Sequence, residues 1–178
     1  GVFAPTDYGA ILDQRYVNTG GLTVRGVDAQ ASYARDAFGG RLAVAANGAW
    51  ISDFQRAVTP AAPFVEFVGQ VANPARFRGR LTADWTRDAL SLGLALNHVS
   101  GFEDALGETI RAQDTVDLSV RVTAPETSRW AGASAILSVR NLFDRAAPFY
   151  DNPTGFGFDA ANSDVIGRFV SLQISKAW

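Results

Sequence analysis

The chain has 178 residues and a mass of 19.0 kDa, which suits one domain or one piece of a larger domain. Its hydrophobic content of 47% excludes intrinsic disorder as the main state, and its net charge of −2 gives no electrostatic basis for binding nucleic acid. The absence of Cys excludes disulfides and thiolate catalysis, and the single His98 disfavours a Ser-His-Asp triad or a His-rich metal site.

The ends and the apolar runs of the sequence give further expectations. The chain contains no Met and begins Gly1-Val-Phe, so we expect a processed chain or a fragment. No signal-peptide pattern is visible, and no apolar run of 18 residues predicts a transmembrane helix. Membrane-spanning strands need only about 9–11 residues with apolar side chains at alternate positions. The sequence is therefore compatible with a β-barrel membrane protein.

Alternation of apolar and polar residues with a period of two predicts strands along most of the chain. In chain order, the expected strands lie near residues 8–17, 27–33, 42–50, 76–86, 90–97, 115–123, 133–140 and 170–178. No segment has the apolar stripe of an amphipathic helix. The sequence therefore predicts an all-β fold, an antiparallel meander of about eight strands, with no internal domain boundary across residues 1–178.

The expected connections alternate in length. Residues 35–40, 87–89 and 124–129 are short, polar and turn-like, whereas residues 56–74, 101–114 and 144–165 form long links. The short link at residues 18–21 departs from this order. Short turns at one end and long loops at the other are typical of a transmembrane β-barrel.

In each expected strand, alternate positions are polar, and we call these positions the polar parity and the others the apolar parity. The polar parity carries many long charged side chains, which suit a wide, wet lumen better than a tight eight-stranded interior. The candidates to face a lumen are Arg78, Arg80, Asp84, Asp117, Arg121 and Arg140. The apolar parity is nearly free of charge, as lipid requires, because Arg or Lys at the bilayer midplane costs about 2–4 kcal/mol. Trp50, Trp85 and Trp178 lie near strand ends on this parity, as an interfacial girdle requires. The alternative is a soluble barrel with these residues in its core.

Residues 138–153 contain a recognisable motif, the pattern V-x-N-L-F-D, as Val139, Asn141, Leu142, Phe143 and Asp144. This segment resembles the penultimate strand and last outer loop of TonB-dependent outer-membrane receptors. Residues 167–178 alternate and end in an aromatic residue. They resemble the signal read by the barrel-assembly machinery, carried here by Val170, Leu172, Ile174 and Trp178, with Lys176 as a departure. Residues 18–28 and 73–81 resemble an earlier hairpin and the start of a strand after a long outer loop.

The resemblance implies that the chain is the C-terminal portion of a barrel of about 22 strands, without the N-terminal plug and the earlier strands. It further implies energised uptake of a siderophore, vitamin or oligosaccharide across the outer membrane of a Gram-negative cell. The implied partners are outer-membrane lipid, the TonB complex through the absent N-terminal region, the assembly machinery and a small-molecule substrate. Two alternatives stay open: a complete eight-stranded outer-membrane barrel with a structural or adhesive role, and a soluble ligand-binding barrel.

For the other candidate sites we favour a structural role over a functional one. Residues 151–164 collect oxygen ligands (Asp151, Asn152, Asp159, Asn162 and Asp164), but their spacing is not that of a calcium loop, and surface loops are rich in such residues. His98 has no haem-uptake motif around it. Arg76, Arg78 and Arg80 either attract an anion or form a structural ladder with carboxylates. No nucleophile or general base stands out, so we expect no enzymatic activity, no cofactor and no metal.

Overall fold

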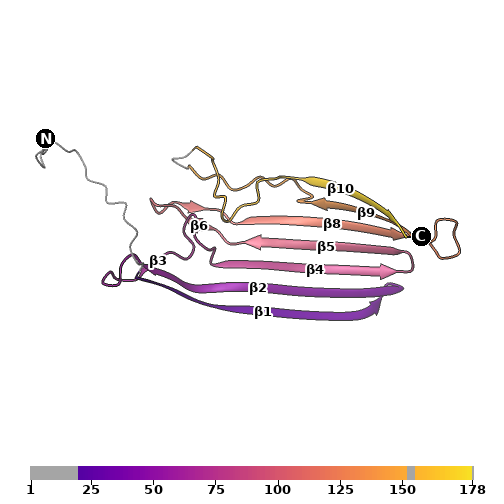
Figure 1. The fold of residues 1–178 in the computed structure, drawn as a ribbon, viewed down its shortest axis with the longest axis horizontal. Helices are drawn as coiled ribbons and strands as arrows, with labels where there is room; N and C mark the ends of the chain where they lie inside the picture. Colours follow the sequence, from indigo (N-terminus) through magenta and orange to yellow (C-terminus); the bar gives the residue numbers. More distant parts are fainter. Residues whose placement is uncertain (1–19, 152–154, 178) are drawn as a thin grey trace, which may run out of the picture.

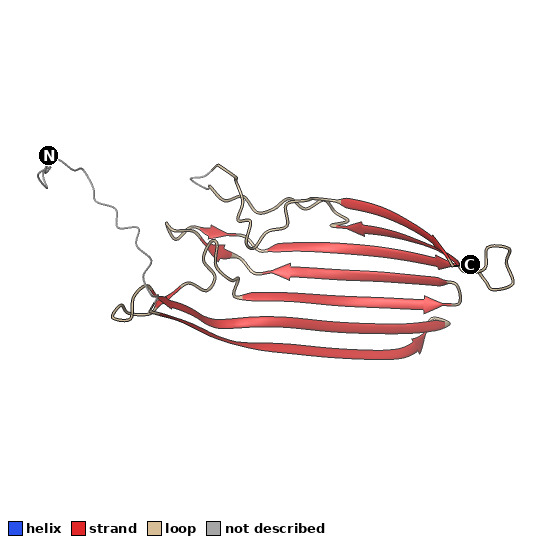
Figure 2. Ribbon diagram, viewed as in Figure 1, coloured by secondary structure: helices blue, strands red, loops and turns tan. Residues whose placement is uncertain are grey.

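The computed structural model describes residues 20–151 and 155–177, and within them it contains strands, turns and loops but no helix. Seven long strands form one antiparallel sheet in chain order (Figures 1 and 2). They are β1 (Gly21–Ala37), β2 (Gly40–Ala57), β4 (Phe77–Arg87), β5 (Leu90–Val99), β8 (Gln113–Thr123), β9 (Ala133–Arg140) and β10 (Phe169–Lys176). The predicted all-β antiparallel meander is confirmed for these seven strands. The strand expected near residues 8–17 lies outside the described residues.

Three two-residue strands lie in the long connections. The strand β3 (Val65–Glu66) pairs with the end of β2, and β6 (Phe102–Glu103) pairs with β7 (Thr109–Ile110) in a small separate sheet. No helix in the described part of the chain is long and apolar enough to cross a membrane.

The connections segregate by length to opposite ends of the sheet. Residues 38–39, 88–89 and 124–132 form the turn end, at the right of Figure 1. Residues 58–76, 100–112, 141–151 and 155–168 form the loop end, at the left. The spacing of the strands along the sequence predicts this arrangement, because every strand of an antiparallel meander reverses direction.

The first two strands are longer than the alternation predicts. A β-bulge at Arg25 and Gly26 opposes these residues to Asp53 and Ile51, which leaves Ser52 as the extra residue of β2. The bulge shifts the side-chain parity by one residue, so the apolar pattern breaks there although the pairing continues. The backbone approaches closely at this point, because a Cβ on Gly26 would lie 2.6 Å from the carbonyl oxygen of Trp50.

The register separates the two faces of the sheet. One unbroken row of paired residues crosses all seven long strands and is apolar throughout: Tyr33, Val44, Ala83, Leu94, Leu118, Val139 and Val170. The adjacent row points to the other side and is small or polar: Ala34, Ala43, Asp84, Gly93, Ser119, Ser138 and Ser171. We call these sides the apolar face and the polar face. A slip of one residue would exchange them, so the pattern fixes the register.

No described layer covers the apolar face. Leu94 is 44% exposed, and Ile174 on the last strand is 74% exposed. The buried apolar side chains lie mainly at the loop end, where Val68, Phe102 and Ile110 form a small core. The sheet is also open, since β1 and β10 are not paired with each other. A large uncovered apolar surface of this kind marks an interaction surface.

Candidate functional site

Five of the six charged residues predicted to share a face line one cavity on the polar face, with a volume of about 890 Å³. These five are Arg78, Arg80, Asp84, Asp117 and Arg140. Arg121, the sixth, pairs with Ser91 on the same face, nearer the turn end. The pairing thus brings all six to one side of the sheet, and that this side borders a lumen stays a prediction.

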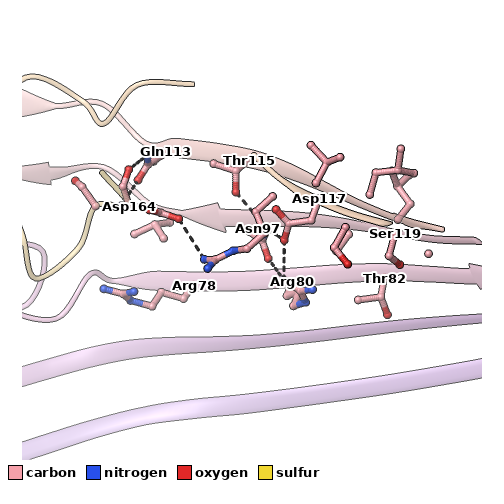
Figure 3. Close-up of a pocket in the computed structure, with 18 of the residues that line it drawn as sticks. Arg78, Arg80, Thr82, Asn97, Gln113, Thr115, Asp117, Ser119 and Asp164 are labelled. Atoms are coloured by element: carbon pink, nitrogen blue, oxygen red, sulfur yellow. Dashed lines mark hydrogen bonds and ion pairs between the residues drawn. The ribbon is translucent and has the colours of Figure 1, made fainter. Parts of the chain in front are cut away.

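A hydrogen-bond network crosses three strands in the wall of this cavity (Figure 3). On β4, Arg80 donates to Asn97 of β5, and it lies 3.4 Å from Asp117 of β8 in an ion pair. Asn97 lies between them and donates to Asp117 at 2.9 Å and to Thr115 at 3.2 Å. Because each member has a partner, the network holds the Arg80 guanidinium against the wall.

Asp117 also joins this wall to the segment that follows β9. Its second carboxylate oxygen accepts a hydrogen bond from the backbone N–H of Asn141 at 3.0 Å. Asn141 is 1% exposed, and its side-chain amide makes two bonds of 2.9 Å with the backbone of Arg145. Its φ of +49° lies in the left-handed region that Asn tolerates better than most residues. The Asn of the V-x-N-L-F-D pattern therefore ends β9 and shapes the loop.

The Asp of the same pattern fixes the return of the loop to β10. The carboxylate of Asp144 accepts the backbone N–H of Arg168 at 2.8 Å and lies 3.8 Å from the Arg168 guanidinium. Residue 168 precedes the first residue of β10. The two polar residues of the motif thus act at the two ends of the 141–168 connection.

Part of this connection folds onto the polar face. Residues 159–164, which we call the clasp, contact the wall at three points. Arg78 donates to the side chain of Asn162 at 2.6 Å and to the carbonyl of Ala161 at 3.2 Å. Gln113 exchanges two hydrogen bonds of 2.9 Å with the backbone of Asp164, and Arg140 lies 3.4 Å from the Asp164 carboxylate. Figure 3 shows Arg78, Gln113 and Asp164 of this contact region among the residues that line the cavity.

The clasp also holds the connection between β2 and β4. The buried carboxylate of Asp159 accepts the backbone N–H of Ala72 at 3.1 Å and the side chain of Asn162 at 2.6 Å. Asn162 donates in addition to the carbonyl of Asn73 at 2.8 Å. These contacts join segments more than 80 residues apart in the chain.

In the oxygen-rich loop of residues 151–164, the buried side-chain oxygens of Asp159 and Asn162 accept hydrogen bonds from within the protein. Among the described residues, no group of three or more His, Cys, Asp or Glu side chains is placed to hold a metal ion. Asp151 is exposed at the far part of the loop, and Asn152 lies outside the described residues. The hydrogen bonds of Asp159 and Asn162 therefore give the loop geometry a structural explanation.

The three arginines at positions 76, 78 and 80 were expected either to attract an anion or to form a ladder with carboxylates, and they differ in their partners. Arg80 has a carboxylate partner two strands away, as a structural ladder requires. Arg78 instead has two uncharged acceptors in the clasp, and Arg76 donates to the carbonyl of Ser52 at 3.4 Å. The lining of the cavity combines hydrogen-bond donors and acceptors with about as much apolar surface.

His98 lies on the apolar face at the loop end. Its Nδ1 is 2.6 Å from a carboxylate oxygen of Asp114, and its ring centroid is 5.8 Å from that of Phe77. The Phe77 ring also covers Gly48 and Gly79, where a Cβ would lie 3.1 Å from it. This environment gives His98 a structural role beside an aromatic ring.

Two features of the site are not predicted above. The first is the part played by Asn97, Thr115 and Gln113. The alternation places these residues on the polar side of their strands, but only charged residues were chosen as candidates. The clasp has no local signal, because its partners lie in distant segments.

Comparisons with protein families, with curated proteins and with solved structures find no match for this chain. The resemblance to TonB-dependent receptors therefore rests on the sequence motifs alone.

Proposed function

We propose that the chain is the C-terminal part of the β-barrel of a TonB-dependent outer-membrane receptor, which imports a scarce small nutrient. The observation that carries the proposal is the uncovered apolar face, which extends over all seven long strands opposite a polar, charged face. In a barrel the apolar face meets lipid and the polar face lines the lumen.

Other observations support the same placement. Trp85 and Trp50 stand on the apolar parity toward the turn end and the loop end, respectively, as the two interfaces of a bilayer require. The long connections gather at one end, as outer loops do. The apolar residues of β10, Val170, Leu172 and Ile174, share one face and are exposed. Trp178 lies outside the described residues, and its part in an assembly signal stays a prediction.

Single cysteines test the placement of the two faces. Since the chain has no Cys, each introduced thiol is the only one. We choose Leu94→Cys for the apolar face and Ser119→Cys for the polar face, both in the middle of strands. In membranes of the producing cells, the thiol at position 119 should react with a charged, water-soluble maleimide. The thiol at position 94 should react with neither this reagent nor a lipid-soluble maleimide, because a thiol in hydrocarbon does not ionise, and it should react after solubilisation in denaturing detergent.

The outcomes separate the alternatives. A soluble fraction in which the thiol at position 94 is shielded from both reagents supports the soluble ligand-binding barrel and contradicts the proposal. Labelling as expected, in a membrane protein no larger than the chain itself, supports the complete small barrel instead. The transport step is tested separately, by comparing energised uptake of ferric chelates, cobalamin and oligosaccharides in a deletion strain and its parent. Equal uptake of all three contradicts the receptor assignment.

A further inference from the structure

The charged residues at the edges of the apolar face differ in sign between its two ends. At the turn end, the strand residues of apolar parity that carry charge are all cations: Arg35, Arg87 and Lys176. They stand opposite Leu42, Leu90 and Ala133. The acidic residues at this end are Asp36 on the polar parity and Asp88 and Glu126 in the turns, and the turn that holds Glu126 also holds Arg129.

Aromatic rings accompany these cations. The Trp130 ring has the Arg129 guanidinium and the Lys176 amine each 5.7 Å from its centroid. The Trp85 indole donates to the carbonyl of Ala37 at 3.1 Å, which holds it at the same end of the sheet. Arg87 lies 3.6 Å from Asp88 with both side chains more than half exposed, and such an exposed pair leaves the guanidinium open to further partners.

The loop end carries charges of both signs. Arg25 stands opposite Asp53, and His98 is hydrogen-bonded to Asp114 at 2.6 Å. On the apolar parity of this edge, Arg25 is thus accompanied by the two carboxylates of Asp53 and Asp114. The excess of positive charge belongs to the turn end alone among the described strands.

We infer that the turn-end edge of the apolar face, formed by Arg35, Arg87, Arg129, Trp130 and Lys176, binds the anionic phosphate headgroups of one membrane leaflet. We call this edge the basic rim, and the inference rests on the proposed membrane placement. Long basic side chains at strand ends extend toward the headgroups while their stems stay on apolar surface. Each one near an anionic surface favours binding, and salt weakens the effect.

Two charge-matched variants test the basic rim. Arg87→Gln/Lys176→Gln removes two cations from the rim, and Arg41→Gln/Arg121→Gln removes two from the polar face near the same end. The full chain is diluted from urea into vesicles of phosphatidylcholine, with or without phosphatidylglycerol. Flotation then gives the ratio of binding to the anionic and the neutral vesicles at low and high salt.

The rim variant should lower this ratio about 30-fold at low salt, and the polar-face variant should leave it unchanged within about twofold. High salt should abolish the difference. An equal fall in both variants means that net charge alone attracts the chain, which overturns the inference while leaving the membrane placement intact. If the unmodified chain binds anionic vesicles no better than neutral ones at low salt, the rim is overturned, and the cysteine labelling described above still decides the membrane placement.

Discussion

Asn141 shows how a single residue shapes the last connection of the sheet. Its amide satisfies both backbone groups of Arg145, and its own N–H reaches Asp117 on the neighbouring strand. A buried amide with all its partners present is costly to remove, because the backbone groups left behind lose their hydrogen bonds.

We expect Asn141→Ala to lower the free energy of unfolding by about 1–3 kcal/mol. Asn141→Gly should recover part of the loss, since Gly adopts the positive φ without strain. The measurement is urea unfolding in detergent, with the exposed Asn47→Ala as the control. Equal midpoints for Asn141→Ala and Asn47→Ala would contradict the structural role of this residue.

Glu66 acts in the same way in the connection between β2 and β4. One carboxylate oxygen accepts the backbone N–H groups of Phe54, Phe67 and Val68 at 2.8–3.1 Å. The bond from Phe54, followed by that from Val68, holds the pKa of Glu66 below its ordinary value of 4.5.

The lowered pKa sets the pH range in which this contact holds. The stabilisation is complete above about pH 4.5 and is lost as the pH falls through the pKa of the folded state. Hydrogen-exchange protection of Phe54 and Val68, corrected for intrinsic rates, should therefore fall below pH 4.5. Glu66→Gln should lose this pH dependence, and the exposed Glu108→Gln should keep it. Constant protection of the unmodified chain from pH 3 to 6 would refute the assignment.

At the scale of elements, the bulge in the first hairpin depends on a glycine. The pairing of β1 with β2 leaves no room for a Cβ at Gly26, because the nearest atoms belong to the backbone of the partner strand. At Gly48 the nearest atoms are the ring of Phe77, a side chain that moves more easily.

We expect Gly26→Ala to destabilise the β1–β2 pair by about 1–3 kcal/mol. Gly48→Ala, the same change on the partner strand, should cost less because the Phe77 ring shifts aside. Hydrogen exchange of the β1 amides measures the effect directly. Faster exchange in Gly48→Ala than in Gly26→Ala would mean that the bulge tolerates a side chain.

The clasp is the second element that a small change should release. Asn162 joins Arg78 of β4, the carbonyl of Asn73 and the carboxylate of Asp159. Asn162→Ala removes all three bonds, so exchange should rise in residues 159–164 and 70–74 but not in β5. Ser163→Ala is the control, since Ser163 has a buried hydroxyl oxygen with no hydrogen-bond partner among the described residues. Unchanged exchange at residues 70–74 in Asn162→Ala would show that the two connections are held by other contacts.

At the scale of the whole molecule, the open sheet limits what the chain does alone. The outer edges of β1 and β10 have no paired neighbour among the described strands. In lipid each unsatisfied backbone group costs several kcal/mol, so an open sheet does not span a bilayer stably.

We therefore expect the purified chain to aggregate or to need detergent, and to form no monomeric pore. The measurement is reconstitution into liposomes, followed by a gel mobility test with and without heating. A discrete folded band that resists denaturant would mean that the chain closes by itself, and it would favour the complete small barrel over the receptor segment.

The sequence by itself determined where the seven long strands lie, which of their residues share a face and which connections between them are long. These properties are local, because successive side chains of a strand point to opposite faces, and a period of two in the sequence therefore gives the face of each residue. The apolar row that contains Leu94 could thus be predicted from the alternation along the strands. The same holds for the position of Arg78, Arg80 and Asp117 on the polar face. The motif residues Asn141 and Asp144 could be marked as important, although not for the hydrogen bonds that explain them.

Only the tertiary structure decided how the charged residues are partnered and where the last connection goes. The sequence places Arg78 on a strand, but it does not reveal that its partner is Asn162, 84 residues away, rather than a carboxylate on the next strand. The bulge at Gly26 likewise depends on the backbone of β2. Such contacts join segments that the chain brings together only on folding, so no local pattern encodes them, whereas the faces of each strand follow from its own residues.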